Sequence, residues 1–229
     1  MFIGHYAPAF LAAGNPRAQR LGALFVAAQL VDIAFFSFVL LGVEHMRITP
    51  GITAMNAIDL YDMPYTHSLI GALGFAAAWA LGTRLLGGGW PAALIGAAVA
   101  VSHWLLDLLV HGPDLTLLGH GARHGLGLWN DPLIEMPLEL GLVAASLIYY
   151  ARRTEARRPR GDIALLLLGV ALLAVQSFNW FAPQPTAPAA SVPASQPLIA
   201  IATYVVLALL ARWAAANRAV RGGPRIRSL

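Results

Sequence analysis

Residues 101–114, VSHWLLDLLVHGPD, carry three ionisable side chains at intervals of four within a run of apolar residues. The apolar run predicts a helix, and this interval places His103, Asp107 and His111 along one face of it. In the middle of a membrane-spanning helix, each ionisable side chain costs roughly 2.5–3.5 kcal/mol. The stretch therefore predicts a buried helix whose polar face binds something.

The composition of the whole chain predicts a membrane protein. The 229 residues are 58% hydrophobic and 11% charged, whereas a soluble domain carries about 25% charged residues. The net charge is +4, yet the basic residues are all arginines that cluster at the ends of apolar runs, as membrane topology requires. We therefore expect no nucleic-acid partner.

Apolar runs long enough to cross a bilayer recur along the chain. A hydrocarbon core of about 30 Å requires roughly 20 helical residues. A shorter apolar segment, 2–13, can only half-cross the membrane or lie at its interface. The expected fold is an all-α, polytopic transmembrane helical bundle with this N-terminal half-helix and about six spans, at 21–43, 66–84, 90–111, 132–151, 162–181 and 197–214.

The arginines predict the orientation of the bundle. Thirteen of the fifteen lie on one side of the expected spans, and the loops on the other side hold only Arg47 and Arg123. By the positive-inside rule the arginine-rich side is cytoplasmic. We therefore expect a multi-pass protein of the bacterial inner membrane with both termini in the cytoplasm.

The chain divides by the distribution of its ionisable residues. Spans five and six contain almost none, so residues 1–152 are expected to form the functional bundle. Residues 153–229 would then supply two spans that act as scaffold or contact a membrane-protein partner. The loop 183–197 between them is uncharged and rich in proline and alanine, which is typical of a structureless connector.

Seven ionisable residues of the first four spans and the half-helix share one depth. Counted at 1.5 Å per residue from the arginine-rich ends, they lie about 18–26 Å into the membrane, in its outer half. Separate exposure of each to lipid would be costly, so we expect them to pair with one another or to share a cation. They are His5, Asp32, His67, His103, Asp107, Glu135 and Glu139.

A metal ion would bring such residues together. His103 and Asp107 can converge on one ion, although a hydrogen-bonded pair that only ties helices together has the same spacing. Asp32 lies in mid-span with no basic residue near it in sequence. The chain has no cysteine, so the ligands would be nitrogen and oxygen, which suit Zn²⁺ most simply and also Mn²⁺ or Fe²⁺.

Several polar residues have a local structural explanation. Thr66 and Asp62 suit the start of the second span, as its N-cap and as an acid near the positive end of the helix dipole, but neither role requires His67. Glu44 and His45 are expected at the exposed end of the first span.

The segment around the start of the fourth span leaves alternatives open. Pro132 and Pro137 predict a distorted first turn, in which one of Glu135 and Glu139 pairs with the cluster. The loop before it contains histidines that either extend the site or are solvated, namely His111, His120 and His124.

The order of these motifs resembles the bacterial membrane-bound metal-dependent hydrolase family. That family typically has an aspartate in its first long span, a T-H-S element and an S-H-x-x-x-D element. Residues 1–140 offer Asp32, THSL with His67, and SHWLLD with His103 and Asp107 in this order, with His5 ahead of them.

The resemblance has one departure and one more distant extension. The family often has His-Arg just before T-H-S, where this chain has DMPYTHS with Asp62. The spacing also resembles zinc-dependent phospholipase C enzymes, in which His, Asp and a later Glu bind a cluster of zinc ions on a helical bundle. By that likeness His111 and either Glu135 or Glu139 would be further ligands.

Together these features predict a metal-dependent hydrolase in the membrane. One to three metal ions would be held by His5, Asp32, His67, His103 and Asp107. A metal-bound water would attack a phosphoryl or acyl ester. Glu135 or Glu139 would act as general base. The depth of the site favours a lipid or lipid-linked substrate. The alternatives are a proton or ion relay or transporter, and an accessory subunit of a larger membrane complex.

Overall fold

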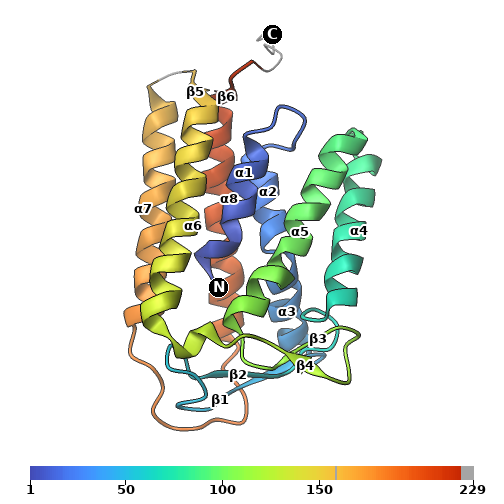
Figure 1. The fold of residues 1–229 in the computed structure, drawn as a ribbon, viewed down its shortest axis with the longest axis vertical. Helices are drawn as coiled ribbons and strands as arrows, with labels where there is room; N and C mark the ends of the chain where they lie inside the picture. The colour runs from blue at the N-terminus through green and yellow to red at the C-terminus, as the bar shows by residue number, and fades with distance from the viewer. Residues whose placement is uncertain (158, 223–229) are drawn as a thin grey trace.

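Eight α-helices run along one long axis in the part of the chain that the structure, a computed structural model, describes, residues 1–157 and 159–222 (Figure 1). The protein is an all-α helical bundle of the membrane-spanning type. Its helices are α1 (Tyr6–Ala13), α2 (Leu21–Ala28), α3 (Leu30–Leu41), α4 (Leu69–Leu85), α5 (Trp90–Val110), α6 (Pro132–Arg153), α7 (Arg160–Phe181) and α8 (Ser195–Ala216), and a 3-10 turn, η1 (Ile3–His5), precedes α1.

The number of spans that the sequence predicts is not confirmed. Helices α5 to α8 each have 21 or 22 residues and are apolar enough to cross a membrane. Helices α2 and α3 would form a fifth span together, but they are bent by 52° at Gln29. Helix α4 has 17 residues and is shorter than these spans. Six full spans are therefore not confirmed, and within the described residues four or five helices qualify.

The first and last helices share one hydrophobic core. Phe10 of α1 and Phe25 of α2 contact each other edge to face, at 5.2 Å between ring centroids. Leu207 and Ala211 of α8 are buried in the same core. Helix α8 packs closely on α2, because a Cβ added at Gly22 would lie 2.8 Å from the Cα atom of Arg212. Small residues at such contacts let membrane helices approach.

Short strands close both ends of the bundle. At the hairpin end, the lower end in Figure 1, lie two antiparallel pairs, β1 (His45–Ile48) with β2 (Ile58–Asp62) and β3 (Leu115–Thr116) with β4 (Arg123–His124). At the arginine-rich end, β5 (Thr154–Ala156) pairs with β6 (Arg218–Val220). The buried Arg218 side chain donates to Thr154 there and forms an ion pair with Asp162.

The expectations for two connecting segments are wrong. The loop 183–197 is not structureless throughout, because Ala189 exchanges two backbone hydrogen bonds with Ile48, of 2.9 and 3.0 Å, and Ser195 already begins α8. The N-cap of α4 is Ser68, whose hydroxyl accepts from the Gly71 N–H at 3.1 Å, so Thr66 does not fill that role.

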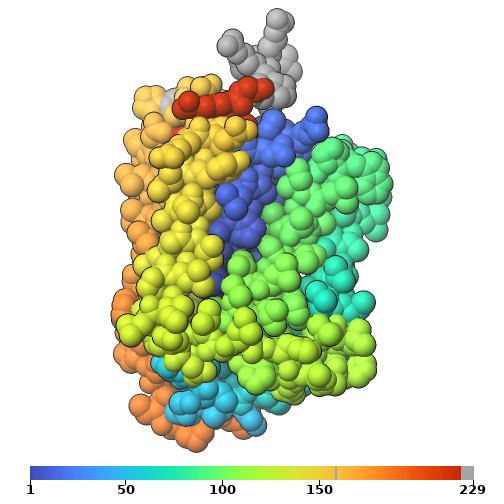
Figure 2. Space-filling model, viewed as in Figure 1, coloured from blue at the N-terminus to red at the C-terminus, as the bar shows by residue number. Residues whose placement is uncertain are grey.

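The N-terminal half-helix, α1, lies inside the bundle, and the chain begins there. Figure 2 shows α1, in blue, between α6 and α5 on one face, and it contacts both. Met1 is buried at mid-height of the bundle (Figure 1). The segment after α1, and not Met1, therefore lies at the arginine-rich end, and the side of the membrane on which the termini lie stays a prediction.

The two ends of the bundle should face opposite sides of the membrane. Because the chain contains no cysteine, single cysteines report on one position each. We expect a membrane-impermeant thiol reagent to label Ser191→Cys, in the exposed loop at the hairpin end, in intact bacterial cells. Leu86→Cys, 91% exposed at the arginine-rich end, should react only after permeabilisation. Labelling of Leu86→Cys alone in intact cells would reverse the orientation.

Candidate metal centre

Four side chains from three segments lie close together. Asp32 lies in the first turn of α3, His67 directly precedes the N-cap of α4, and His103 belongs to α5 with Asp107 one turn later. Asp32 Oδ1 lies 3.4 Å from Nε2 of both histidines. Asp107 Oδ2 lies 3.0 Å from His103 Nε2 and 3.7 Å from His67 Nε2. The shared depth in the sequence correctly predicted that Asp32 and His103 meet.

The second oxygen of Asp107 faces a second set of nitrogens. Asp107 Oδ1 lies 3.0 Å from His5 Nε2 and 3.5 Å from His111 Nε2. The backbone amino nitrogen of Met1 lies 3.3 Å from the same oxygen. The His5 ring stacks on the His103 ring, with centroids 3.8 Å apart. Asp107 thus joins two neighbouring groups of possible ligands, and His111 belongs to the centre.

The histidine rings are held through their other nitrogen. His103 Nδ1 lies 2.8 Å from the carbonyl oxygen of Ala28, at the break between α2 and α3. A carbonyl only accepts, so Nδ1 carries the proton and Nε2 of the neutral ring presents a lone pair. His111 Nδ1 lies 2.9 Å from Asp114 Oδ1, which fixes its ring in the same way.

These lone pairs face carboxylate oxygens that also lack protons. His103 Nε2 and Asp107 Oδ2 are buried, and within residues 1–157 and 159–222 neither has a hydrogen-bond partner. Two lone pairs 3.0 Å apart repel each other unless a proton or a cation lies between them. A proton on one histidine would satisfy one contact, whereas an ion satisfies all the contacts of the group that binds it. At a tetrahedral ion with bonds of about 2.0–2.2 Å, neighbouring ligand atoms are about 3.3–3.6 Å apart. The 3.4 Å from Asp32 to each histidine falls in this range, and the 3.0 and 3.7 Å from Asp107 lie close to it.

The two glutamates of α6 have different surroundings. Helix α6 begins regularly at Pro132, so the expected distortion of its first turn is absent and both side chains are buried. Glu139 Oε1 accepts from the N–H groups of Phe2 and Gly4 at 2.6 and 2.8 Å, and Gln176 donates to Oε2. Neither oxygen of Glu135 has a hydrogen-bond partner among the described residues. Glu139 therefore holds η1 in place, and Glu135 is the uncommitted carboxylate.

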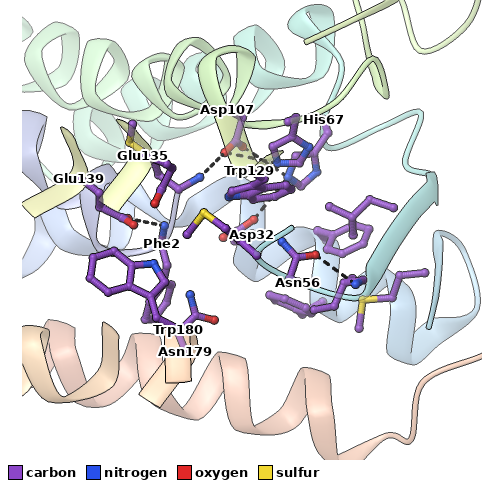
Figure 3. A pocket seen from close by; sticks show the side chains of 18 of the residues that line it. Phe2, Asp32, Asn56, His67, Asp107, Trp129, Glu135, Glu139, Asn179 and Trp180 are labelled. Atoms are coloured by element: carbon purple, nitrogen blue, oxygen red, sulfur yellow. Dashed lines mark hydrogen bonds and ion pairs between the residues drawn. The ribbon is translucent and has the colours of Figure 1, made fainter. Parts of the chain in front are cut away.

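A cavity of about 140 Å³ connects these groups. In Figure 3, Glu135 and Glu139 lie on its α6 wall, with Asp107 and His67 across from them and Trp180 on the α7 side. A water molecule occupies about 30 Å³ of liquid, so the cavity holds a few waters or one small polar group. Apolar residues from three sides line the rest, including Phe36, Met46, Ile58, Leu60 and Trp129.

Some residues of the centre carry no clear signal in the sequence. The Tyr204 hydroxyl of α8 donates to Asp32 Oδ2 at 2.8 Å, and the Gln176 amide of α7 binds Glu139. Both lie in helices that seemed to contain no functional group. Gln176 is a polar signal at the end of an apolar stretch, because an amide in a membrane helix needs a partner.

Other polar residues lie away from the centre. Asp62 pairs with His45 at 2.7 Å on the surface of the β1–β2 hairpin, so it is not a ligand here. His120 is exposed, and His124 lies in β4. Glu44 was expected to be exposed, but it is completely buried, and that expectation is wrong.

Fold and site together define a helical membrane protein with a buried histidine–carboxylate centre next to a small cavity. Comparison with protein-family models, with curated proteins and with solved structures finds no match. Conclusions about its chemistry therefore rest on the centre itself.

The contrast between the two glutamates is testable through stability. Glu139→Ala leaves the N–H groups of Phe2 and Gly4 buried without an acceptor, at about 1–3 kcal/mol for each such group. We expect a lower melting temperature in detergent. Glu135→Ala is the matched control one turn away and should melt at or above the wild-type temperature, because it removes an unpartnered buried carboxylate. Equal destabilisation by both would contradict this assignment.

Proposed function

We propose that the protein is a metal-dependent hydrolase of the bacterial inner membrane. The substrate would be a phosphoryl or acyl ester, carried on a lipid or a lipid-linked molecule. The order of Asp32, THSL and SHWLLD resembles the membrane-bound metal-dependent hydrolases and supports this assignment. Zinc suits the nitrogen and oxygen donors most simply, and manganese or iron(II) remain compatible with them.

One observation carries the proposal. His103 Nε2 faces the carboxylates of Asp32 and Asp107 at the spacing of metal ligands. Its Nδ1 already donates to a carbonyl, so a proton on Nε2 would either break that hydrogen bond or give the ring a positive charge. The metal ions would be held by three overlapping groups, which are Asp32 with His67 and His103, His5 with His103 and Asp107, and His67 with Asp107 and His111. When bound, such an ion polarises an ester oxygen and lowers the pKa of a water molecule.

The remaining groups of the cavity have roles that follow from their contacts. Glu135 has two free oxygens and would accept the proton that the attacking water loses. The Tyr204 hydroxyl holds Asp32 through Oδ2, which leaves Oδ1 directed at the histidines. Glu139 keeps η1, and with it His5, at the level of the centre.

The shape of the cavity favours an amphiphilic substrate. At about 140 Å³ it accommodates the reacting polar group, while Phe36, Met46 and Trp180 at its lining suit an apolar neighbour. An acyl chain can remain in the bilayer while the ester reaches the centre. The outward faces of α7 and α8 expose Leu166, Phe178 and Val206, which would contact lipid or a membrane-protein partner.

A proton or ion relay has less support. The His–Asp contacts run from His5 to Asp114 and reach the hairpin end. Towards the arginine-rich end, the core of the described residues is apolar, with Phe10, Leu24 and Leu168 completely buried. A relay across the membrane needs polar groups on both sides. An accessory subunit without catalysis would have no use for the unpartnered Glu135.

Metal analysis of the purified protein tests the proposal directly. We expect about stoichiometric metal in the wild type and little in Asp107→Asn, because the asparagine loses the charge that offsets a divalent cation in a low-dielectric site. Asp62→Asn changes an acid on the surface hairpin and should keep its metal. A metal-free wild type after purification and reconstitution with Zn²⁺, Mn²⁺ or Fe²⁺ would refute the hydrolase.

Glu135→Gln separates catalysis from metal binding. The variant keeps the size of the side chain but cannot accept a proton, so hydrolysis should fall by about 10²–10⁴-fold with metal content unchanged. Hydrolysis is measured on fluorogenic phosphodiester and carboxylic ester lipids in mixed micelles. Wild-type turnover by Glu135→Gln would remove this residue from the mechanism.

A further inference from the structure

The segment that carries His67 is fixed by a carboxylate from the preceding hairpin. Glu44 Oε1 accepts from the N–H groups of Tyr65 and Thr66, at 2.8 and 2.9 Å. Its other oxygen, Oε2, lies 2.6 Å from the Thr66 hydroxyl. All three partners are therefore donors, and Glu44 and Thr66 are completely buried. Capping of the backbone explains the first oxygen but not the second.

The Thr66 hydroxyl connects Glu44 to the candidate ligand. Thr66 Oγ1 lies 2.9 Å from His67 Nδ1. A hydroxyl has one proton, and a carboxylate can only accept, so the proton of Thr66 points at Glu44. The hydroxyl oxygen can then only accept from His67, which places the ring proton on Nδ1. His67 Nε2 is left with its lone pair directed at Asp32 Oδ1, 3.4 Å away.

The geometry points to Glu44 as a positioning residue that sets the tautomer of His67 through Thr66, so that Nε2 can bind the metal. This inference rests on the proposed metal centre, which it deepens. Residues that fix a ligating histidine in this way raise metal affinity by about 10–100-fold in other proteins. In His103 and His111, Nδ1 likewise faces an acceptor, the Ala28 carbonyl and Asp114 respectively. In all three rings the proton is therefore on Nδ1 and Nε2 is left to bind the metal.

Replacement of Glu44 by glutamine reverses the direction of the hydrogen bonds from this residue through Thr66 to His67, with almost no change in the shape of the side chain. The amide oxygen of Glu44→Gln can still accept from Tyr65 and Thr66, but its NH₂ group donates to the Thr66 hydroxyl. The hydroxyl must then donate to His67 Nδ1, which moves the ring proton to Nε2 and blocks it as a ligand. Thr66→Val is a second variant that removes the hydroxyl and with it the control of the tautomer.

The experiment reads the tautomer without metal and the affinity with it. Histidine labelled with ¹⁵N in the metal-free protein gives the tautomer of each of the seven rings by NMR, and His67→Asn identifies the signal. Zinc affinity is measured by competition with a chelator. We expect Nδ1–H for wild-type His67, Nε2–H in Glu44→Gln, and about 10–100-fold weaker zinc binding in both Glu44→Gln and Thr66→Val. Thr66→Ser keeps the hydroxyl, and Asp62→Asn alters a nearby exposed acid, so both should behave as wild type.

The outcomes separate this inference from the function on which it rests. An Nε2–H tautomer in the wild type, or an unchanged Nδ1–H tautomer in Glu44→Gln, overturns the role of Glu44, even if zinc binds. Weaker binding with an unchanged tautomer would mean that Glu44 acts only as a backbone cap, which also overturns it. The expected tautomers in a wild type that binds no metal would support the hydrogen-bond chain and refute the metal centre.

Discussion

The arrangement of the bundle depends on the buried carboxylate of Asp107. Within the described residues no arginine lies within ion-pair distance of it, and its partners are histidines and the Met1 amine. Removing one ion from water costs several kcal/mol even after relaxation. Two other segments bring histidines to it, η1 with His5 and the residues before α4 with His67. A third segment, α3, brings Asp32 to the His67 nitrogen that faces Asp107. Glu139 holds the first of these segments in place.

Helical regularity is interrupted at the level of this centre. Helices α2 and α3 bend at Gln29, next to the Ala28 carbonyl that fixes His103. His67 lies before the first turn of α4, and His111 is the residue that ends α5. Irregular backbone at membrane depth is tolerated only where protein buries it or where it lines a cavity. A shorter α4 and a broken first span accompany the polar centre, and they are the reason that fewer than six helices qualify as spans by length among the described residues.

The sequence contained the depth of each ionisable residue but not its direction around the helix. Depth was sufficient to predict that Asp32 and His103 meet, because both lie in apolar stretches and Asp32 has no basic residue near it in sequence. It could not separate Glu135 from Glu139, since one turn of helix changes the depth by only about 5.4 Å. Glu44 was misplaced for another reason. Its burial depends on how the β1–β2 hairpin folds back over the bundle, which no periodicity records.

The two sides of the polar layer have opposite character, and this bears on what can reach it. Towards the arginine-rich end, Phe10, Phe25 and Leu168 seal the core. Towards the hairpin end, β1, β2 and Trp129 line the cavity with apolar side chains that still leave a space. A fully hydrated ion or sugar would lose its water there with few compensating hydrogen bonds. A molecule with one polar group and a long apolar part would lose little, because only the polar group has to leave water. On the proposed function, the selectivity for a lipid ester would come from the cavity lining, and the chemistry from the layer beneath it.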